Sequence, residues 1–502
     1  VCPYRIKVFE MGPAPTIGAG RGETFFKKFF PGKNIPSKKD FFMVFSGIPF
    51  LFYFLPVLLP CYFLVPRPAK NMVLLLFSLI FYAVGEPVYI LLMLFSITQS
   101  YLLVNLSERD AKRRKLWFIL TVILSVLPLV WYKYAGFLTV NLNLLPGVNL
   151  PVPKHSLPIG ISFYTFQLIG YAADVYMKRC PAQKNPLHLA LYVSLFPQLI
   201  AGPIVRYADV AEQLVNRTHS ADKFTKGILR FSVGVGKKVL IANVLGELCK
   251  ELGTSMLGVW GYAIASALQI YYDFSGYSDM AIGLGKMFGF DIMENFNYPY
   301  ISKSVAEFWR RWHMSLGSWF RDYIYIPMGG NRVSKPRWML NILTVWMLTG
   351  LWHGAEWTFV LWGLYFAVFL VLEKLLAKYI AKIPPVLNRL LVLFVVMVSF
   401  MIFDSPTISE AARRVVTLFD FTNPADTVSL YYLRSYAGTL AAAVLGATPL
   451  LRDTAKKLAA SDSRTVQNVM NALVPVFVCA VLIVSTAYLV DGSYNPFLYF
   501  RF

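Results

Sequence analysis

The sequence predicts an all-α protein that crosses the membrane several times. Of its 502 residues, 57% are hydrophobic and only 15% are charged, and apolar runs of spanning length recur from Phe50 to Leu489. About 20 apolar residues are enough for a helix to cross a bilayer. Because a backbone in lipid has to satisfy its own hydrogen bonds, these runs are expected to be helices.

The formal net charge is +21, which on a soluble protein would suggest nucleic-acid binding. Here the Lys and Arg residues gather in short loops between apolar runs, a pattern that indicates cytoplasmic loops and anionic lipid. We therefore expect a multi-pass protein of the cell membrane, with membrane lipids and no nucleic acid among its partners. The five cysteines show neither metal-site nor disulfide spacing, which predicts packed thiols.

The first 41 residues differ from the rest in composition. They contain Gly and Pro breaks and a basic-aromatic patch at Phe25–Phe30, but no apolar core of the kind a signal peptide needs. We predict an irregular basic tail over residues 1–41, with a surface-lying anchor as the alternative. Residues 42–502 are predicted to form the membrane-embedded domain.

The first third of this domain predicts membrane spans joined by loops of contrasting charge. The loop Ser107–Lys115 carries five basic residues and is expected in the cytoplasm, whereas the Pro-rich loop Leu144–Pro158 is expected outside. The predicted spans are Ser46–Val65, Asn71–Val84, Val88–Leu106, Leu116–Trp131 and the polar-faced segment Pro158–Tyr176.

Two segments that follow are apolar but irregular. Within Leu187–Val205, two prolines and a glycine at residues 197–203 are tolerated in lipid only where other helices cover them, which predicts a re-entrant or broken segment. Gly227–Leu248 is interrupted by Arg230, Lys237 and Lys238, which predicts an amphipathic or tilted helix.

Polar and acidic residues cluster within the apolar stretch Ser255–Phe290. Asp273 and Asp279 do not share a helical face, so we predict no coupled acid–base dyad. Together with Ser275 they either cap and join helices or line a cavity. The second alternative is favoured because a charged group is costly inside a membrane.

The connector Asn295–Asn331 predicts a helix lying at the membrane interface. Ser304 fits the N-cap of a capping box, with a glutamate three residues on. His313 would share one face of this helix with Trp309 and Phe320. It is either an interfacial residue among tryptophans or part of the site.

Arginines give the connector its charge. Arg310, Arg311 and Arg321 either contact lipid headgroups or form a basic mouth for an anionic donor, such as a phosphate-bearing pantetheine carrier.

The apolar run Trp338–Leu372 carries the ionisable pair His353 and Glu356 near its middle. The run is too long for one span, so two segments are expected to meet near His353. Gly350 and Gly354 flank the histidine and allow close backbone approach or a helix break.

An ionisable group at bilayer depth costs roughly 2.5 kcal/mol or more, which predicts that His353 faces a protein interior or a wet cavity. It is either a structural histidine or a catalytic one. Glu356 either orients a ring nitrogen or is a helix-end carboxylate. Read as a single helix, the run also aligns Trp357 with the histidine. Because no companion ligands stand nearby, we predict no metal site.

The remaining predicted spans are Leu387–Phe403, Tyr436–Leu450 and Met470–Leu489, separated by polar linkers. The candidate substrate- or donor-binding residues are Arg310, Arg311, Arg321, Asp273, Ser275, Asp279, Glu356 and Trp357.

Five motifs and the end of the chain together resemble one known family. They are FPQLIAGPIVR at 196–206, YYDFSGYSDMAIGLGKMFGF at 271–290, NFNYPY at 295–300, FWRRWHMSLGSWFRDYIYIPMGGNR at 308–332, TGLWHGAEWTFVLWGLY at 349–365 and NPFLYFRF at 495–502. Over residues 42–502 the sequence resembles the membrane-bound O-acyltransferases, and within them the alginate O-acetylation branch.

The resemblance implies roughly ten to twelve membrane helices, with re-entrant and interfacial helices, around a central tunnel. It matches His353 to the family's buried histidine and His313 to its second polar position. It implies acetyl transfer from a cytoplasmic thioester, acyl-CoA or an acyl carrier, to an exported polysaccharide, without a bound cofactor. An extracytoplasmic acetyltransferase is the usual partner in this branch.

Our hypothesis is that His353 acts as general base, or orients the attacking hydroxyl, in its neutral form. His313 and the nearby arginines would position the donor. The alternatives are D-alanyl transfer from a carrier protein to teichoic acid, a transporter, for which inverted repeats are expected, and a non-enzymatic scaffold for polysaccharide export.

Overall fold

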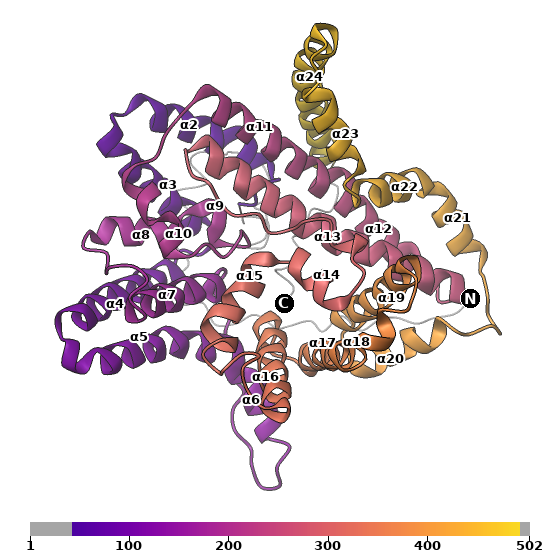
Figure 1. Cartoon of the computed structure of the whole chain (residues 1–502), viewed down its shortest axis with the longest axis horizontal. Coiled ribbons are helices and arrows are strands. Elements are labelled where there is room, and N and C mark those ends of the chain that lie inside the picture. Colours follow the sequence, from indigo (N-terminus) through magenta and orange to yellow (C-terminus); the bar gives the residue numbers. More distant parts are fainter. Residues whose placement is uncertain (1–42, 492–502) are drawn as a thin grey trace, which may run out of the picture. The chain divides into compact units, whose positions relative to one another are not determined.

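The computed structural model describes residues 43–491, and every regular element within them is a helix (Figure 1). The predicted all-α fold is confirmed. The predicted tail at residues 1–41 and the chain ending at 495–502 lie outside the described residues.

The helices follow one another along the chain, with η marking 3-10 and π turns. They are η1 (Phe50–Phe54), α2 (Leu55–Leu64), η2 (Arg67–Ala69), α3 (Lys70–Gly85), α4 (Tyr89–Arg109), η3 (Ala111–Arg113), α5 (Arg114–Leu129), η4 (Val130–Tyr134), α6 (Ala135–Leu142), α7 (Ile161–Tyr176), α8 (Pro186–Ser194), α9 (Phe196–Leu199), α10 (Tyr207–Val215), α11 (Ala221–Gly236), η5 (Lys237–Asn243), α12 (Val244–Glu251), α13 (Met256–Met287), η6 (Pro299–Ile301), α14 (Val305–Arg311), α15 (Met314–Phe320), η7 (Arg321–Tyr325), α16 (Lys335–His353), α17 (Trp357–Leu375), α18 (Ala377–Ile380), α19 (Pro385–Asp404), α20 (Ile408–Thr417), α21 (Thr427–Ser435), α22 (Ala437–Gly446), α23 (Leu450–Ala459) and α24 (Arg464–Val490).

Six helical stretches within the described residues are long and apolar enough to cross a membrane. Two shorter apolar helices accompany them, and the expected number of ten to twelve membrane helices stays a prediction. The six stretches are Arg67–Gly85, Tyr89–Arg109, Ala111–Leu142, Trp357–Leu375, Pro385–Asp404 and Arg464–Val490.

The third of these stretches is longer than the sequence predicted. The predicted span ended at Trp131, but the helix continues through η4 and α6 to Leu142. Lys133 lies just beyond the predicted end, within the longer helical stretch. Its ammonium group donates hydrogen bonds to backbone carbonyl groups inside the protein.

The predicted broken segment is confirmed. A short helix, α8, ends at Ser194, and α9 starts at Phe196 after the non-helical residue Leu195. All four residues of α9 are buried. The two prolines of this segment are therefore covered by protein, as the membrane setting requires.

α13 is one continuous helix of 32 residues, and α11 packs against it (Figure 1). The two backbones touch at glycines, because a Cβ built on Gly234 would lie 2.6 Å from the Gly276 carbonyl oxygen. A Cβ on Gly227 would lie 2.7 Å from the carbonyl oxygen of Gly283. Small residues at such crossings allow helices to approach closely.

The connector contradicts the prediction of a single interfacial helix. Ser304 caps α14 as predicted, accepting a hydrogen bond from the Glu307 amide at 3.0 Å. The helix then stops, because His313 adopts a left-handed conformation with φ 45° and ψ 52°, and α15 starts after it. Trp309, His313 and Phe320 therefore do not lie on one helical face.

The apolar run around His353 is a hairpin of two helices, as predicted. α16 ends at His353, Gly354 is extended, and α17 starts at Trp357. Gly350 allows the close approach, since a Cβ there would collide with the Phe359 carbonyl oxygen. Two aromatic and aliphatic clusters, one around α13 and α19 and one around α17 and α19, pack beside this hairpin.

The last predicted spans are found with shifted ends. α19 matches the predicted Leu387–Phe403, α22 is only ten residues long, and α24 begins earlier, at Arg464. α24, at the top of Figure 1, packs on α11 and η5 over part of its length, but its apolar window is almost entirely unburied within the described chain.

Candidate functional site

His353 lies at the last position of α16, enclosed by aromatic side chains. Its ring centroid is 4.9 Å from that of Trp352, 5.0 Å from Trp362 and 5.1 Å from Phe403. Only 8% of the residue is exposed, and Nδ1 is buried with no hydrogen-bond partner among residues 43–491. A buried polar atom left unpaired costs about 1–3 kcal/mol, so this nitrogen is available for a ligand.

His313 is the second buried histidine, and its backbone is strained. A non-glycine residue in the left-handed region costs on the order of 1–3 kcal/mol, and such residues cluster at functional sites. The side chain of Asn295 holds this conformation, because its Oδ1 accepts hydrogen bonds from the Ser315 amide at 3.1 Å and the Ser315 hydroxyl at 2.9 Å. The Met314 amide also donates to the Asn295 carbonyl oxygen.

Asn295 also orients the His313 ring. Its Oδ1 lies 3.2 Å from Nδ1 of His313, while its amide nitrogen donates to the Ser278 hydroxyl. Because a carbonyl oxygen only accepts, this contact favours the tautomer with hydrogen on Nδ1. Nε2 of His313 then carries a lone pair, and it is buried without a partner.

Trp352 connects the two histidines. Its ring centroid is 5.8 Å from that of His313 and 4.9 Å from that of His353. Phe163 and Phe166 of α7 pack on the same indole. Both imidazoles therefore pack on the same tryptophan.

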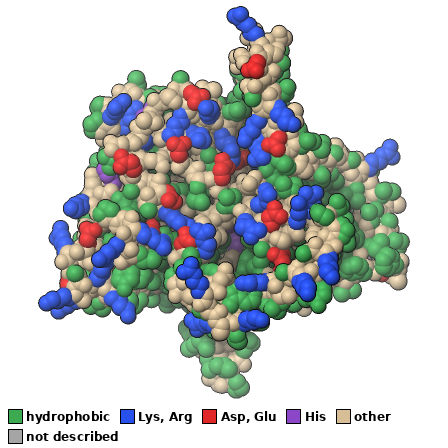
Figure 2. Space-filling model, in the orientation of Figure 1, with side chains coloured by type: hydrophobic (Ala, Val, Ile, Leu, Met, Phe, Trp, Pro, Cys, Tyr) green, Lys and Arg blue, Asp and Glu red, His purple; other side chains and the backbone are tan. Residues whose placement is uncertain are grey.

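A cavity of about 980 Å³ opens beside His313. Figure 2 shows Lys and Arg side chains gathered around a hollow near the middle of this face, over α14, α15 and α16. His353 is not among the residues that line the cavity. The lining includes Trp309, Arg310, His313, Phe320, Arg321, Tyr325, Trp338, Trp346, Thr349, Glu373 and Lys374.

Tryptophans bring the cavity close to His353. Trp309 and Trp346 line it, and their ring centroids are 4.6 Å apart. Trp362 packs on both Trp309, at 5.7 Å, and His353. The indole nitrogens of Trp309 and Trp362 are buried without hydrogen-bond partners in the described chain, so two unused donors stand between the cavity and His353.

The three candidate arginines differ in their partners. Arg310 and Arg321 line the cavity, but Arg311 does not. Arg311 pairs with Glu307 at 2.9 Å, and Arg321 pairs with Asp322 at 2.7 Å. Within the described residues Arg310 has no such acidic partner.

The charge state of the acidic partners supports this distinction. Burial alone would raise the pKa of Asp322, but the hydrogen bond from Arg321 and the charge of Arg206 hold that pKa below its usual value. Asp322 therefore stays ionised, and it is shared between Arg206, at 2.7 Å, and Arg321, so it offsets part of the Arg321 charge. Arg310 is left as the arginine best able to bind an anion.

Trp357 does not lie where the single-helix alignment placed it, whereas Glu356 fits the alternative of a helix-end carboxylate, at the N-cap of α17. Glu356 is exposed, and no hydrogen bond joins it to Nδ1 of His353. Trp357 is 56% exposed and donates its indole hydrogen to Oδ1 of Asn141 at 2.9 Å. The helix break at Gly354 separates both residues from the face that His353 occupies, so the single-helix alignment was wrong.

The acidic cluster of α13 is paired with basic residues of the preceding helices. Asp273 lies 2.5 Å from Lys238, and Asp279 lies 2.7 Å from Arg230 and 2.8 Å from Lys237. Neither carboxylate, nor Ser275, lines the cavity. The alternative of joining helices therefore describes these carboxylates better than the lining of a cavity.

Sequence reasoning overlooked several residues of the site. Asn295, Trp352 and Trp362 lie inside the family motifs, but nothing in their local spacing marks them as partners of the histidines. Lys133 could have been predicted from the sequence, because it is an ionisable residue inside an apolar run, the same observation that drew attention to His353.

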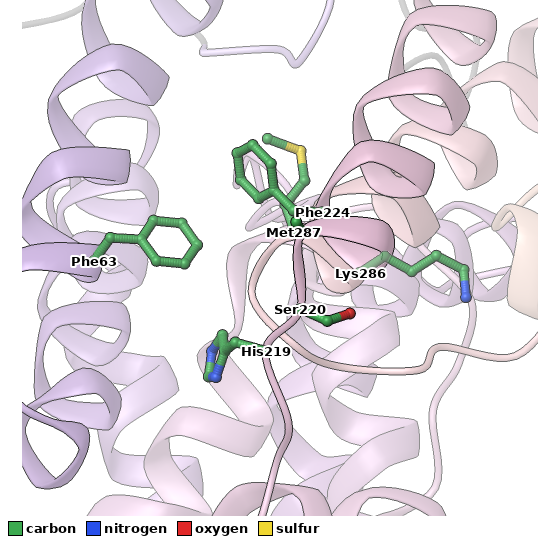
Figure 3. Close-up of a pocket in the computed structure, with 7 residues that line it drawn as sticks. Phe63, His219, Ser220, Phe224, Lys286 and Met287 are labelled. Atoms are coloured by element: carbon green, nitrogen blue, oxygen red, sulfur yellow. The ribbon is translucent and has the colours of Figure 1, made fainter. Parts of the chain in front are cut away.

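A second cavity, of about 370 Å³, lies between α2 and α11 (Figure 3). Phe63, His219, Ser220 and Lys286 are among the residues that line it. Nε2 of His219 is 2.7 Å from the Tyr62 hydroxyl, so this imidazole already has a protein partner. His219 is exposed, so it lacks the buried, unpaired nitrogen that distinguishes His313 and His353 within the described residues.

No group of three or more His, Cys, Asp or Glu residues in the described chain is arranged to hold a metal ion.

The structure is a helical membrane fold with two buried histidines, one of which lines a cavity. Comparison of the sequence with known proteins identifies its class. Residues 181–406 match the model of MBOAT, the membrane-bound O-acyltransferase family. The chain belongs to this family: it is an O-acyltransferase and a multi-pass protein of the cell membrane.

Its relatives are named for three different polymers. The chain is 42% identical to the probable alginate O-acetylase AlgI of Pseudomonas aeruginosa, over 76% of this chain and 75% of that protein. It is 33% identical to the peptidoglycan O-acetyltransferase of Helicobacter pylori, over 74% and 79%. It is 32% identical to the teichoic acid D-alanyltransferase of Bacillus subtilis, over 58% and 77%.

Proposed function

We propose that this O-acyltransferase moves an acetyl group from a cytoplasmic thioester donor to a hydroxyl of an exported polysaccharide, alginate or a similar polymer. The observation that carries the proposal is the pair of buried histidines with unpartnered nitrogens, one of them in the wall of a large cavity. The greater identity to the alginate O-acetylase than to the other relatives supports the choice of acetyl group and polymer.

The cavity suits an anionic thioester. Arg310, Arg321 and Lys374 line it, and its acidic residue, Glu373, is occupied by the Val305 and Ala306 amides. Guanidinium and ammonium groups bind phosphate through charge-assisted hydrogen bonds. Acyl-CoA and a phosphopantetheine-bearing acyl carrier both present a phosphate at a distance from the thioester, so either is a suitable donor.

Basic loops support a cytoplasmic donor. Lys335 and Arg337 at the start of α16 and Lys374 at the end of α17 lie at the charged ends of this hairpin, and such ends are typically cytoplasmic. His353 lies at the opposite end of the hairpin. The segment α5–α6, which contacts this end, continues into the loop 143–158, and the sequence predicts that this loop lies outside the cell. The acceptor would therefore reach His353 from the outer side.

In the proposed reaction, His353 accepts the proton of the acceptor hydroxyl as its oxygen attacks the thioester carbonyl carbon. The new C–O ester bond forms, the C–S bond breaks, and the departing thiolate takes the proton from the imidazolium. His313 and Arg310 hold the donor, with the lone pair on Nε2 of His313 facing it. Acetyl transfer of this kind needs no electron acceptor, and the thioester is consumed as a substrate.

The product side implies a partner. A polymer exported from the cell has to meet the acetyl group at the outer end of the hairpin. We propose that an extracytoplasmic acetyltransferase receives or directs the acetyl group there, with the membrane enzyme supplying it.

The proposal is tested with purified protein in lipid nanodiscs and a thioester donor labelled in its acetyl group. We expect thioester consumption that depends on the protein and label transfer to added polysaccharide. Consumption of a D-alanyl carrier instead would favour teichoic-acid-type transfer, and no consumption of either donor would favour a transporter or scaffold.

A further inference from the structure

Lys133 lies about two-thirds of the way along an apolar helical stretch. It belongs to η4, within the 32-residue stretch Ala111–Leu142 that is long enough to cross the membrane. No carboxylate within the described residues pairs with it. An ionisable group at such a position is costly and therefore points to a function.

The ammonium group binds the end of α16. Its Nζ donates to the carbonyl oxygen of Trp352 and, at 3.2 Å, to that of His353. The neighbouring Tyr134 hydroxyl donates to the Leu351 carbonyl oxygen at 2.7 Å.

These three bonds complete the helix end. The last four carbonyl groups of an α-helix lack partners within the helix. At α16 the Gly354 amide reaches Gly350, and Lys133 and Tyr134 satisfy the remaining three carbonyls. A cation there also complements the negative end of the helix dipole.

Within the described part of the chain, no side-chain hydrogen bond holds the His353 ring. Functional histidines are usually oriented by a hydrogen bond to the second ring nitrogen, but Nδ1 of His353 has no partner. The ring is held by aromatic contacts and by its backbone alone. The backbone is fixed by the bonds from Lys133 and Tyr134.

We infer that Lys133 and Tyr134 are positioning residues for the transfer reaction: they fix the end of α16 so that the His353 imidazole meets the acceptor. This inference rests on the proposed function. A misplacement of about 1 Å at a reacting group can cost roughly a hundredfold in rate, so loosening this helix end should lower turnover without weakening donor binding in the separate cavity.

The test measures kcat and KM for the labelled acetyl thioester, per folded protein, in Lys133→Met, Lys133→Arg and Tyr134→Phe. We expect Lys133→Met to lower kcat roughly ten- to a hundredfold with an unchanged KM for the donor. Lys133→Arg should restore most of the loss, because it keeps the cationic donor. Tyr134→Phe removes one bond of three and should lower kcat several-fold at an unchanged melting temperature.

Lys154→Met and Tyr132→Phe are matched controls, because Lys154 is exposed and Tyr132 packs on Tyr89 and His155 instead of on α16. Wild-type kcat in both Lys133→Met and Tyr134→Phe would overturn the inference, as would a loss confined to KM. If Lys133→Met does not fold, a wild-type kcat in Tyr134→Phe overturns it. If the wild-type protein consumes no thioester, the proposed function itself is refuted. That outcome is distinct from a failure of the positioning role alone, in which the wild type is active and the variants match it.

Discussion

Two regions of this molecule bury ionisable groups among apolar helices. In one region these groups are paired with each other, and in the other they keep unpaired nitrogen atoms. Where α11 and η5 meet α13, the carboxylates of Asp273 and Asp279 pair with Lys238, Arg230 and Lys237. Around α14–α17, the two histidines keep a nitrogen each without a partner.

This difference separates ionisable groups that stabilise the fold from those that can take part in the reaction. A buried charge that is paired inside the chain has its electrostatic needs met and offers little to a ligand. An unpartnered buried nitrogen beside a cavity has a cost that only a ligand or water offsets. In the sequence, both regions showed ionisable residues within apolar stretches. Only the second region has buried polar atoms that remain available to a substrate.

The first prediction is the largest and concerns the paired region. Lys238→Met leaves Asp273 buried without this cation, and removing one partner of a buried pair costs about 3–5 kcal/mol. We expect a clear drop in melting temperature in detergent, with turnover per folded molecule unchanged. Lys237→Met is the matched control, since Asp279 keeps Arg230 and Lys237 is more exposed. Lost turnover at unchanged stability would make this region part of the site.

The second prediction separates the His313 imidazole from its backbone. Asn tolerates left-handed conformations, so His313→Asn should keep the break between α14 and α15 while removing Nε2. We expect turnover to fall about a hundredfold, because a donor misplaced by about 1 Å reacts roughly a hundredfold more slowly, and the melting temperature to change little. His219→Asn, at an exposed imidazole outside the large cavity, should keep wild-type turnover. Equal effects of both variants on turnover would contradict the distinction between the buried histidine of the cavity and an exposed one.

The third prediction concerns the unpaired arginine of the cavity. Arg310→Ala should raise KM for the donor about tenfold, since hydrogen bonds to charged groups contribute about 1.5–3 kcal/mol, and kcat should be unchanged. Arg311→Ala, whose side chain already pairs with Glu307, should affect KM far less. KM is measured at low and high salt, because screening weakens an exposed ionic contact. Equal KM values for the two variants would contradict this assignment.

The smallest effect is expected at Glu356. Its carboxylate is exposed and does not bond to Nδ1 of His353, so Glu356→Gln should change kcat less than about twofold, the scale expected for a surface charge. Steady-state kinetics of thioester consumption check this. A tenfold loss would restore the role of orienting group that the sequence suggested.

Local signals in the sequence predicted much of the fold. The hairpin at His353 followed from run length and two glycines, and the broken segment at residues 195–203 followed from its prolines. The Ser304 cap followed from its spacing to Glu307. Each of these features is decided by residues close together in the chain.

The rest depends on contacts between distant residues. The run Trp309–His313 contains no Gly or Pro and is typical of a helix, yet it breaks because Asn295, 18 residues away from His313, holds a left-handed turn. The pairing of Asp273 with Lys238 likewise spans two helices. No period or cap encodes such contacts, so the candidate histidines were predicted and their partners were not.

The most direct test of the account is the rate of acetyl-thioester consumption by His353→Ala, per folded protein. The account predicts at least a hundredfold loss, the lower end of the acid–base contribution, with a melting temperature close to that of the wild type. Consumption at the wild-type rate would contradict it, because the free imidazole at the end of α16 would then have no part in the reaction.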